Sequence, residues 1–414
     1  MFSLRAQINS MKVTARTSLT ILLLGLFLPC LPAAFGVPKD FALQGVQEKE
    51  VLFGQSAALS GAAKDLGINM RLGLLAAFNQ INEKGGVAGR KLKLLTHDDS
   101  YEPEQTASNI RKLIDQDKVF AVLGGVGTPT SKAAVPILSQ TPLLYIGPFT
   151  GASFLRTSHP DTVINVRASY AQETKEMVLR LKKDLKVSRI GVLYQNDSYG
   201  LDGLAGVRKA VKSLGGVRIV SLGTYVRNTT AVKTALLDIK QGRPQAVIII
   251  GSYAPAASFI RWAEKMGMND VIFLSVSFVG VSALAQELRG SKTHVFVTQV
   301  VPFPWGHQTP LLKNYKKAMK TLKKTSHVGL ISLEGYVVGR LVIKALERVG
   351  EKLDYKSFAK AFKRSQNKFN LDGLELFFDD AKDNQGSDRV FLTRIDGPKK
   401  IVPVSSLKAL RKRK

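Results

Sequence analysis

The chain has 414 residues, of which 45% are hydrophobic and 22% are charged. This length suits two lobes of ordinary domain size, and this composition excludes a disordered chain because enough apolar surface is available to form cores. A formal net charge of +28 raises the question of nucleic acid, but the basic residues are mixed with acids and form no recognisable nucleic-acid module. We therefore expect no nucleic-acid partner.

The N-terminus has the order of a secretory signal. Arg5, Lys12 and Arg16 precede an apolar run at 19–31, and small residues follow that run. The run is shorter than the roughly 20 apolar residues that a membrane span needs. The sequence therefore predicts a signal peptide at 1–36 and export of the mature chain to the periplasm.

The only cysteine, Cys30, lies inside this segment. It is either an incidental apolar residue of the signal or a lipidation site, although the preceding FLP lacks the small residues expected before a lipidated cysteine. A mature chain that begins at 37 contains no cysteine, which excludes disulfides and thiol chemistry there.

From residue 49 the sequence alternates short apolar runs with stretches that have apolar residues at helical spacing. In the first half we expect strands at 50–58, 91–97, 120–124 and 143–146, and helices at 68–84, 103–117 and 130–139. The same alternation resumes near residue 170, with strands at 189–194, 219–225, 246–251 and 271–275 and helices at 171–183, 200–214, 230–240 and 256–266. Repeated β-α units build mostly parallel sheets with helices on both faces. The predicted fold class is therefore α/β, with two similar Rossmann-like lobes.

The C-terminal part is predicted to complete both lobes. Further helices are expected at 309–323, 332–349 and 355–365. Two apolar stretches, 374–378 and 390–395, are predicted to pair as a closing hairpin.

Glycine and hydroxyl residues follow two neighbouring strands of the first half, where open α/β sheets bind ligands. The first turn is GVGTPTS at 125–131 and the second is GPFTGAS at 147–153. Thr128, Thr130 or Ser131 can cap the next helix, and the start of that helix either binds an anion such as a carboxylate or is simply a capped helix end. The first turn lacks the third glycine of a dinucleotide fingerprint and the lysine of a phosphate loop, so a nucleotide is disfavoured.

In the second half, Tyr199 and Tyr253 each follow a predicted strand. Tyrosine suits a binding cleft because it offers an apolar face and a hydroxyl group. Either tyrosine could instead be a packing residue between the lobes.

Residues for catalysis or metal binding are not grouped in the sequence. No serine has the pattern of a nucleophile elbow, and the adjacent Asp98 and Asp99 would point to opposite sides of an extended chain. The histidines show no metal-ligand spacing; they are His97, His159, His294, His307 and His327. We expect no enzyme activity, no metal and no cofactor, and a hydrogen-bonding role for the aspartate pair.

Three stretches together resemble the leucine/isoleucine/valine-binding protein family, the type I periplasmic substrate-binding proteins of ABC transporters. They are FGQSAALSG (53–61), INEKGGVAG (81–89) and DDSYEP (98–103), in that order. The resemblance extends from about residue 49 to about 395.

The resemblance implies two lobes joined by a three-strand hinge, each lobe built from discontinuous segments. Lobe 1 would comprise 49–168 and 298–350, and lobe 2 would comprise 169–297 and 351–400, with an N-terminal extension at 37–48 and a basic tail at 401–414.

It also implies a ligand site between the lobes. The residues implied for it are Leu66, Thr128, Phe149, Thr150, Gly151, Tyr199, Tyr253 and Ser277. In amino-acid binders of the family an acidic residue at the position that resembles Ser277 receives the ligand's ammonium group. Ser277 is neutral here, so an ordinary α-amino acid would need another acid, for which Glu334 is a candidate.

The implied function is capture of a small amino acid, amide or carboxylate by lobe closure. A monomer would deliver this ligand to the membrane permease of an ABC transporter. A ligand-sensing component of a signalling receptor is the alternative.

Overall fold

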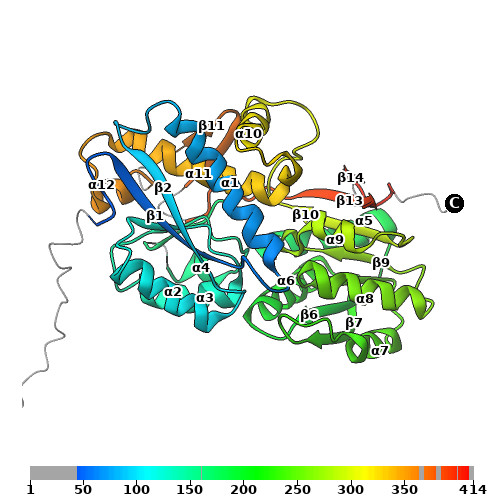
Figure 1. The fold of residues 1–414 in the computed structure, drawn as a ribbon. Coiled ribbons are helices and arrows are strands. Elements are labelled where there is room, and N and C mark those ends of the chain that lie inside the picture. Colours follow the sequence, from blue (N-terminus) through cyan, green and yellow to red (C-terminus); the bar gives the residue numbers. More distant parts are fainter. Residues whose placement is uncertain (1–43, 160, 363–367, 379–383, 399, 410–414) are drawn as a thin grey trace, which may run out of the picture. The chain divides into compact units, whose positions relative to one another are not determined.

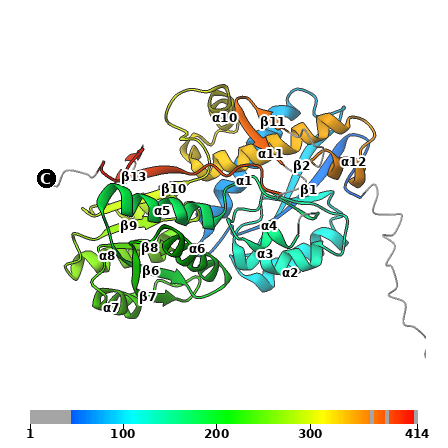
Figure 2. The same ribbon diagram turned by 180° about the vertical axis from the view of Figure 1, so that it is seen from behind.

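The computed structural model describes residues 44–409 except 160, 363–367, 379–383 and 399 (Figures 1 and 2). The predicted signal peptide, most of the extension at 37–48 and the end of the basic tail lie outside the described residues. In the described part, no helix combines the length and the apolar character needed to cross a membrane.

Two sheets organise the described chain, and we call the parts built on them the first lobe and the second lobe. The first sheet is wholly parallel, in the order β2-β1-β3-β4-β5. Its strands are β1 (Glu50–Ala57), β2 (Lys91–Asp98), β3 (Ala121–Leu123), β4 (Tyr145–Ile146) and β5 (Val163–Ile164).

The second sheet has the order β14-β13-β10-β9-β8-β6-β7 and is parallel from β10 to β7. Its strands are β6 (Arg189–Gln195), β7 (Arg218–Tyr225), β8 (Ala246–Ile250), β9 (Ile272–Ser275), β10 (His294–Gln299), β13 (Phe391–Gly397) and β14 (Lys400–Pro403). Strands β13 and β14 add to its edge in antiparallel pairing. A separate two-stranded sheet consists of β11 (Lys368–Leu371) and β12 (Leu374–Phe377).

Helices cover these sheets (Figures 1 and 2). They are α1 (Lys64–Asn82), α2 (Pro103–Asp115), α3 (Thr128–Leu138), α4 (Phe154–Thr157), α5 (Tyr170–Leu185), α6 (Ser198–Leu214), α7 (Lys233–Gln241), α8 (Tyr253–Lys265), α9 (Val281–Glu287), α10 (Pro310–Thr321), α11 (Leu330–Val349) and α12 (Tyr355–Lys360), with short 3-10 turns η2 (Ser277–Val279) and η3 (Thr325–His327). The strand β8 is apolar along its whole length and fully buried, as expected for a strand covered on both faces.

Helix α11 lies against α1 although the two are far apart in the sequence (Figure 1). Their backbones approach closely at glycines. A Cβ atom at Gly73 would lie 2.0 Å from the carbonyl oxygen of Ser332, and one at Gly335 would lie 2.2 Å from that of Met70. Any side chain at these two positions would force the helices apart, so the first lobe depends on both glycines.

The chain passes between the lobes after β5, after β10 and before β13. The first and third passages are bonded to each other at Asn165. Its N–H group donates to the carbonyl oxygen of Asn384 (2.8 Å), and its own carbonyl oxygen accepts from the N–H group of Gly386 (2.7 Å). The predicted α/β class with two mostly parallel sheets is confirmed, and each lobe draws on segments from both halves of the chain.

The predicted closing hairpin is wrong. Strand β12 pairs with β11 around the tight turn at Asp372 and Gly373, whereas β13 pairs with β14 and β10. The two apolar stretches therefore belong to different sheets. More than ten residues separate the two stretches, so the sequence between them has no tight-turn pattern from which their pairing could be predicted.

The assignment of 351–400 to the second lobe needs revision. The ring of Tyr355 stacks on Phe120 next to β3, with centroids 5.1 Å apart, and Phe358 contacts the same ring. Because these contacts bury α12 against the first lobe, we propose that the first lobe extends through β12 to about residue 378.

Candidate functional site

Two threonine hydroxyls meet where β3 and β4 end. Thr128 is the first residue of α3, Thr150 lies in the turn after β4, and their Oγ1 atoms are 2.6 Å apart. Thr150 also donates to the hydroxyl of Tyr170 (3.2 Å). The residue before Thr128 has to be glycine, because Gly127 has a φ of 107° and a Cβ there would lie 2.2 Å from the Tyr101 ring. The pair of hydroxyls therefore lies at the amino end of α3, where N–H groups and the helix dipole favour an anion.

An aromatic cluster surrounds this position, and Phe278 of the second lobe lies at its centre. The Phe278 ring centroid is 5.9 Å from Tyr101, 5.4 Å from Phe149 and 4.7 Å from Tyr199. Tyr199 also contacts Tyr170 at 5.3 Å. All these rings are buried. The cluster supplies apolar surface from both lobes, suited to an aliphatic or aromatic ligand group.

Local sequence places Tyr170 and Tyr199, the two tyrosines that the second lobe contributes to this cluster, at the starts of helices. Ser169 and Gln172 form a capping box that begins α5, so Tyr170 is the first helical residue. Asp197 caps α6 by accepting from the N–H group of Tyr199 (2.9 Å). Both rings consequently project from first turns, where a strand end meets a helix start.

Next to the aromatic cluster lies a buried group of three charged side chains: Arg167, Glu173 and Glu334. Arg167 Nη2 is 3.4 Å from Oε1 of Glu173, and Arg167 Nη1 is 3.4 Å from Oε1 of Glu334. The guanidinium also lies 4.8 Å from the centroid of the Phe149 ring. Burying charges is costly unless they are paired and hydrogen-bonded. This group therefore requires an explanation beyond packing.

Glu173 is held by donors from the second lobe. It accepts from the N–H group and the hydroxyl of Ser277 (2.8 and 3.0 Å) and from Thr298 Oγ1 (2.6 Å). Arg167 also donates to the Ser277 hydroxyl. Ser277 therefore hydrogen-bonds to the acidic side chain of Glu173. It does not take the place of an acid in this group.

Arg167 and Glu334 have unused hydrogen-bonding capacity within the described residues. Arg167 Nε and Nη1 and Glu334 Oε1 are buried without a hydrogen-bond partner there. Burial raises the pKa of Glu334 to about 7, with Arg167 opposing the increase and Glu173 adding to it. A carboxylate acceptor and guanidinium donors are therefore available to a bound polar group.

Leu66 and Tyr253 meet at Gly280, two residues beyond Phe278. A Cβ at Gly280 would lie 2.7 Å from Leu66 Cδ2 and 3.7 Å from Tyr253 Cδ1. A cavity of about 210 Å³ opens beside this contact and is lined by both lobes, including Asp65, Gln286 and His327.

A polar rim joins the lobes on the other side of Tyr101. Arg227 Nη2 donates to Glu102 (2.6 Å), and Asn228 Nδ2 donates to Glu102 (2.7 Å) and to the carbonyl oxygen of Ser100 (3.1 Å). Gln195 Nε2 donates to the Tyr101 hydroxyl (3.3 Å). Such contacts exist only while the lobes meet, so they favour that arrangement.

The aspartate pair has the hydrogen-bonding role that we predicted. Asp98 accepts from the N–H groups of Leu59 and Ser100 (2.8 and 2.9 Å). Asp99 accepts from the Ser56 hydroxyl (2.7 Å) and from the N–H group of Tyr101 (3.0 Å). Burial raises the pKa of Asp99 to about 6, and the hydrogen bonds from Ser56 and Tyr101 oppose the increase. These bonds fix the loop that carries Tyr101.

The structure brings the eight sequence-predicted site residues into one region between the lobes. Six of them belong to the aromatic and charged groups or lie next to them, namely Thr128, Phe149, Thr150, Gly151, Tyr199 and Ser277, and Leu66 and Tyr253 lie beside Gly280. Glu334, which the sequence left unplaced, lies against Arg167.

Five further residues of this region were not predicted from the sequence: Tyr101, Arg167, Tyr170, Glu173 and Phe278. A signal existed for Arg167, because an arginine that follows an apolar strand in the context INVRASY is unusual. In the described residues no group of three or more histidine, cysteine, aspartate or glutamate side chains could hold a metal ion.

Two α/β lobes that meet around buried polar and aromatic side chains define a two-lobed ligand-binding protein. Residues 50–400 match the family model described as "Periplasmic binding protein", and the chain belongs to that family. It is a family of non-catalytic substrate-binding proteins.

Solved structures agree with this membership. A possible leucine/isoleucine/valine-binding protein from Rhodopirellula baltica SH 1 is 38% identical, covers 88% of this chain and 97% of its own, and has a TM-score of 0.79. A substrate-binding periplasmic protein from Ralstonia solanacearum is 27% identical, covers 85% and 99%, and has a TM-score of 0.76.

A relative known by sequence is the Leu/Ile/Val-binding protein homolog 3 of Brucella melitensis biotype 1. It is 23% identical over 315 residues, which are 75% of this chain and 83% of the relative.

Proposed function

We propose that this protein captures a small zwitterionic, amino-acid-like ligand between its lobes in the periplasm and delivers it to the permease of an ABC transporter. The observation that carries the proposal is the buried group of Arg167, Glu173 and Glu334. It combines unused donors and an unused acceptor with an adjoining aromatic cluster.

The ligand's carboxylate would bind at the amino end of α3, to the hydroxyls of Thr128 and Thr150 and to backbone N–H groups beside Gly151. These hydroxyls lie 2.6 Å apart, so one ligand oxygen can reach both. The helix terminus supplies partial positive charge without a lysine or arginine.

The ligand's ammonium group would be received by Glu334. With both carboxylates ionised, Glu173 and Glu334 share the ion pair with Arg167, while the positive charge of Arg156 also acts on Glu334. Glu334 would therefore still attract a cationic group. Glu334 would thereby do what an acid at position 277 does in amino-acid binders that the sequence resembles. Its Oε1 atom lies 3.4 Å from Arg167 Nη1 but accepts no hydrogen bond from the described residues, so it can accept one from such a group.

The side chain of the ligand would pack among Tyr101, Phe149, Tyr199 and Phe278. This surface is apolar, and relatives carry names that refer to leucine, isoleucine and valine. These three amino acids are therefore the first ligands to test.

The test is thermal unfolding of the protein with leucine, isoleucine, valine, other amino acids, 4-methylpentanoate, short amides and urea. A ligand that binds only the folded state raises the melting temperature by mass action. We expect a shift with an apolar amino acid and little with 4-methylpentanoate, which lacks the ammonium group. Equal shifts with both compounds would contradict the role of Glu334.

Variants sharpen this test. Thr128→Ala, Tyr253→Ala and Glu334→Gln should each reduce the ligand-induced shift. Glu347→Gln is the control, because Glu347 lies on the same helix as Glu334 but is paired with Lys344 on the exposed face. No shift with any compound would refute the solute-binding function while leaving the fold unaffected.

A further inference from the structure

The chain from residue 288 to residue 333 contains lysine and arginine without any acid. Between Glu287 and Glu334 the sequence has no aspartate or glutamate. The basic residues in this interval are Arg289, Lys292, Lys313, Lys316, Lys317, Lys320, Lys323 and Lys324. Six of these lie on α10 and in the turn that follows it, so the charge is concentrated on one element of the first lobe.

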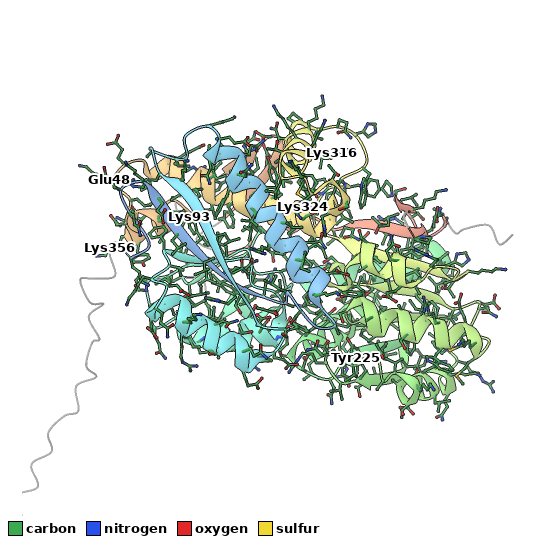
Figure 3. All side chains as sticks on the ribbon, in the orientation of Figure 1. Glu48, Lys93, Tyr225, Lys316, Lys324 and Lys356 are labelled. Carbon is green, nitrogen blue, oxygen red and sulfur yellow. The ribbon has the colours of Figure 1, made fainter. Side chains whose placement is uncertain are left out.

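Helix α10 places four of the lysines on one face. Lys313, Lys316, Lys317 and Lys320 have the i, i+3, i+4, i+7 spacing of neighbours on a helix surface. The opposite face, which includes Leu312, Tyr315 and Met319, is buried against the lobe. Figure 3 labels Lys316 and Lys324 on this segment. We call Lys313, Lys316, Lys317, Lys320, Lys323 and Lys324 the lysine face.

These charges are not neutralised by the described residues around them. None of the six lysines forms an ion pair within the described chain. The acids packed near α10 are already paired, Asp372 with Arg340 (2.8 Å) and Glu347 with Lys344 (2.7 Å). Like charges at i, i+3 and i, i+4 destabilise a helix, and an anionic partner would relieve this cost.

An exposed tryptophan precedes the helix. Trp305 is 40% exposed and packs edge-on against Phe303, with ring centroids 5.2 Å apart. The loop that carries both rings leads directly into α10, whose first turn is capped by Thr309. A tryptophan beside a lysine-rich helical face is the composition of segments that bind at a membrane–water interface.

We propose that the lysine face and Trp305 form a docking surface for a bilayer that contains anionic phospholipid. The choice of a bilayer over an acidic protein rests on residue type. Protein interfaces are depleted in lysine and enriched in arginine, which matches carboxylates bidentately. The lysine face has six lysines and no arginine. Compact, independent ammonium groups suit a fluid array of phosphate headgroups.

The experiment is co-sedimentation of the full chain with vesicles of phosphatidylcholine alone or with roughly a third phosphatidylglycerol, at low and at physiological ionic strength. The test variant changes Lys313, Lys317, Lys320 and Lys324 to glutamine. The matched control makes the same change at four exposed lysines of the second lobe: Lys175, Lys183, Lys209 and Lys212. Both variants lose the same charge and keep the same N-terminal apolar run. Thermal unfolding verifies that each variant is folded.

We expect binding to anionic vesicles only, weakened by salt. The test variant should lose at least tenfold in affinity, since each lysine near such a surface contributes roughly fivefold, and the control should lose less than twofold. Equal losses in both variants would overturn the proposal, because net charge alone would then explain binding. Equal binding to neutral vesicles, or binding to heparin without binding to vesicles, would also overturn it.

The second measurement uses tryptophan fluorescence. The chain has two tryptophans, and Trp262 lies in the second lobe between Lys233 and Lys265. In a Trp262→Phe variant, Trp305 is the only reporter, and its emission should shift to shorter wavelength with anionic vesicles. An unchanged spectrum in the presence of bound vesicles would overturn the assigned surface. Neither measurement depends on the ligand, so either proposal can fail alone.

Discussion

Arg167 Nη1 lies 3.4 Å from Glu334 Oε1, and both side chains are buried where the first passage between the lobes meets the start of α11. Each charge compensates for the desolvation of the other. Removing one partner of such a pair leaves an uncompensated buried charge, which costs more than the pair contributes.

Arg167→Met should therefore destabilise the protein by about 3–5 kcal/mol in the free energy of unfolding, since Glu173 and Glu334 would both remain buried. Urea unfolding measures this change. The control is Arg180→Met, because the partly exposed Arg180 pairs with Glu176 on the surface of α5. That change should cost less than about 1 kcal/mol. Similar values for both variants would show that the buried group is not electrostatically coupled.

The Glu334→Gln variant should gain in stability relative to the wild type as the pH rises. Burial raises the pKa of Glu334 from 4.5 to about 7, so the folded chain binds this proton more tightly than the unfolded chain does. The corresponding stabilisation is complete below about pH 4.5 and is lost as the pH rises to about 7. Over this window the difference in unfolding free energy should change by on the order of 2–3 kcal/mol. A difference that stays constant with pH would contradict the buried, proton-binding state of Glu334.

Gly335→Ala should destabilise the first lobe by several kcal/mol, because its Cβ would lie 2.2 Å from the Met70 carbonyl oxygen. The control is Gly329→Ala, just before the same helix, where the nearest atom to an added Cβ is 3.6 Å away. Thermal unfolding should separate the two variants clearly. If both unfold alike, the close approach of α1 and α11 would not limit stability.

Glu102→Gln should increase the ligand's dissociation rate more than it changes the association rate. The Glu102 carboxylate accepts from Arg227 and Asn228 of the second lobe, and these bonds form only when the lobes meet. Stopped-flow fluorescence with the ligand found in the thermal test measures both rates. Glu104→Gln is the control, since Glu104 lies exposed on α2. An unchanged dissociation rate would place the rim outside the binding mechanism.

Local patterns predicted most of the fold. In the β-α units up to residue 275, the spacing of apolar residues within each element distinguishes helices from strands. The bounds expected for these elements lie close to those observed. Strand β5 was missed because it has only two residues. Strand β10 and its pairing with β13 were missed because the two strands are far apart in the chain, and the pairings of β11 with β12 and of β13 with β14 were missed as well. Likewise, the assignment of residues 351–378 to a lobe depends on the contact between Tyr355 and Phe120, which are far apart in the sequence.

The candidate site divides in the same way. Thr128, Thr150 and Tyr199 follow strands, so a general rule of α/β sheets locates them. Arg167 and Glu173 are recognised as candidate site residues by their hydrogen bonds to Ser277, which lies more than 100 residues further along the chain. No local pattern can report a contact of that kind. Their roles in ligand binding stay predictions until the thermal test is done.

The packing of α11 on α1 also sets the order in which the protein can be completed. The Tyr336 hydroxyl donates to Gln80 Oε1, and 256 residues separate the two. During synthesis α1 consequently cannot pack against α11 until most of the chain has been made, so the helical layer of the first lobe is completed late. For a chain that we propose to leave the cytoplasm, this delay is useful: an unfinished core resists passage through a narrow translocation channel less than a finished one.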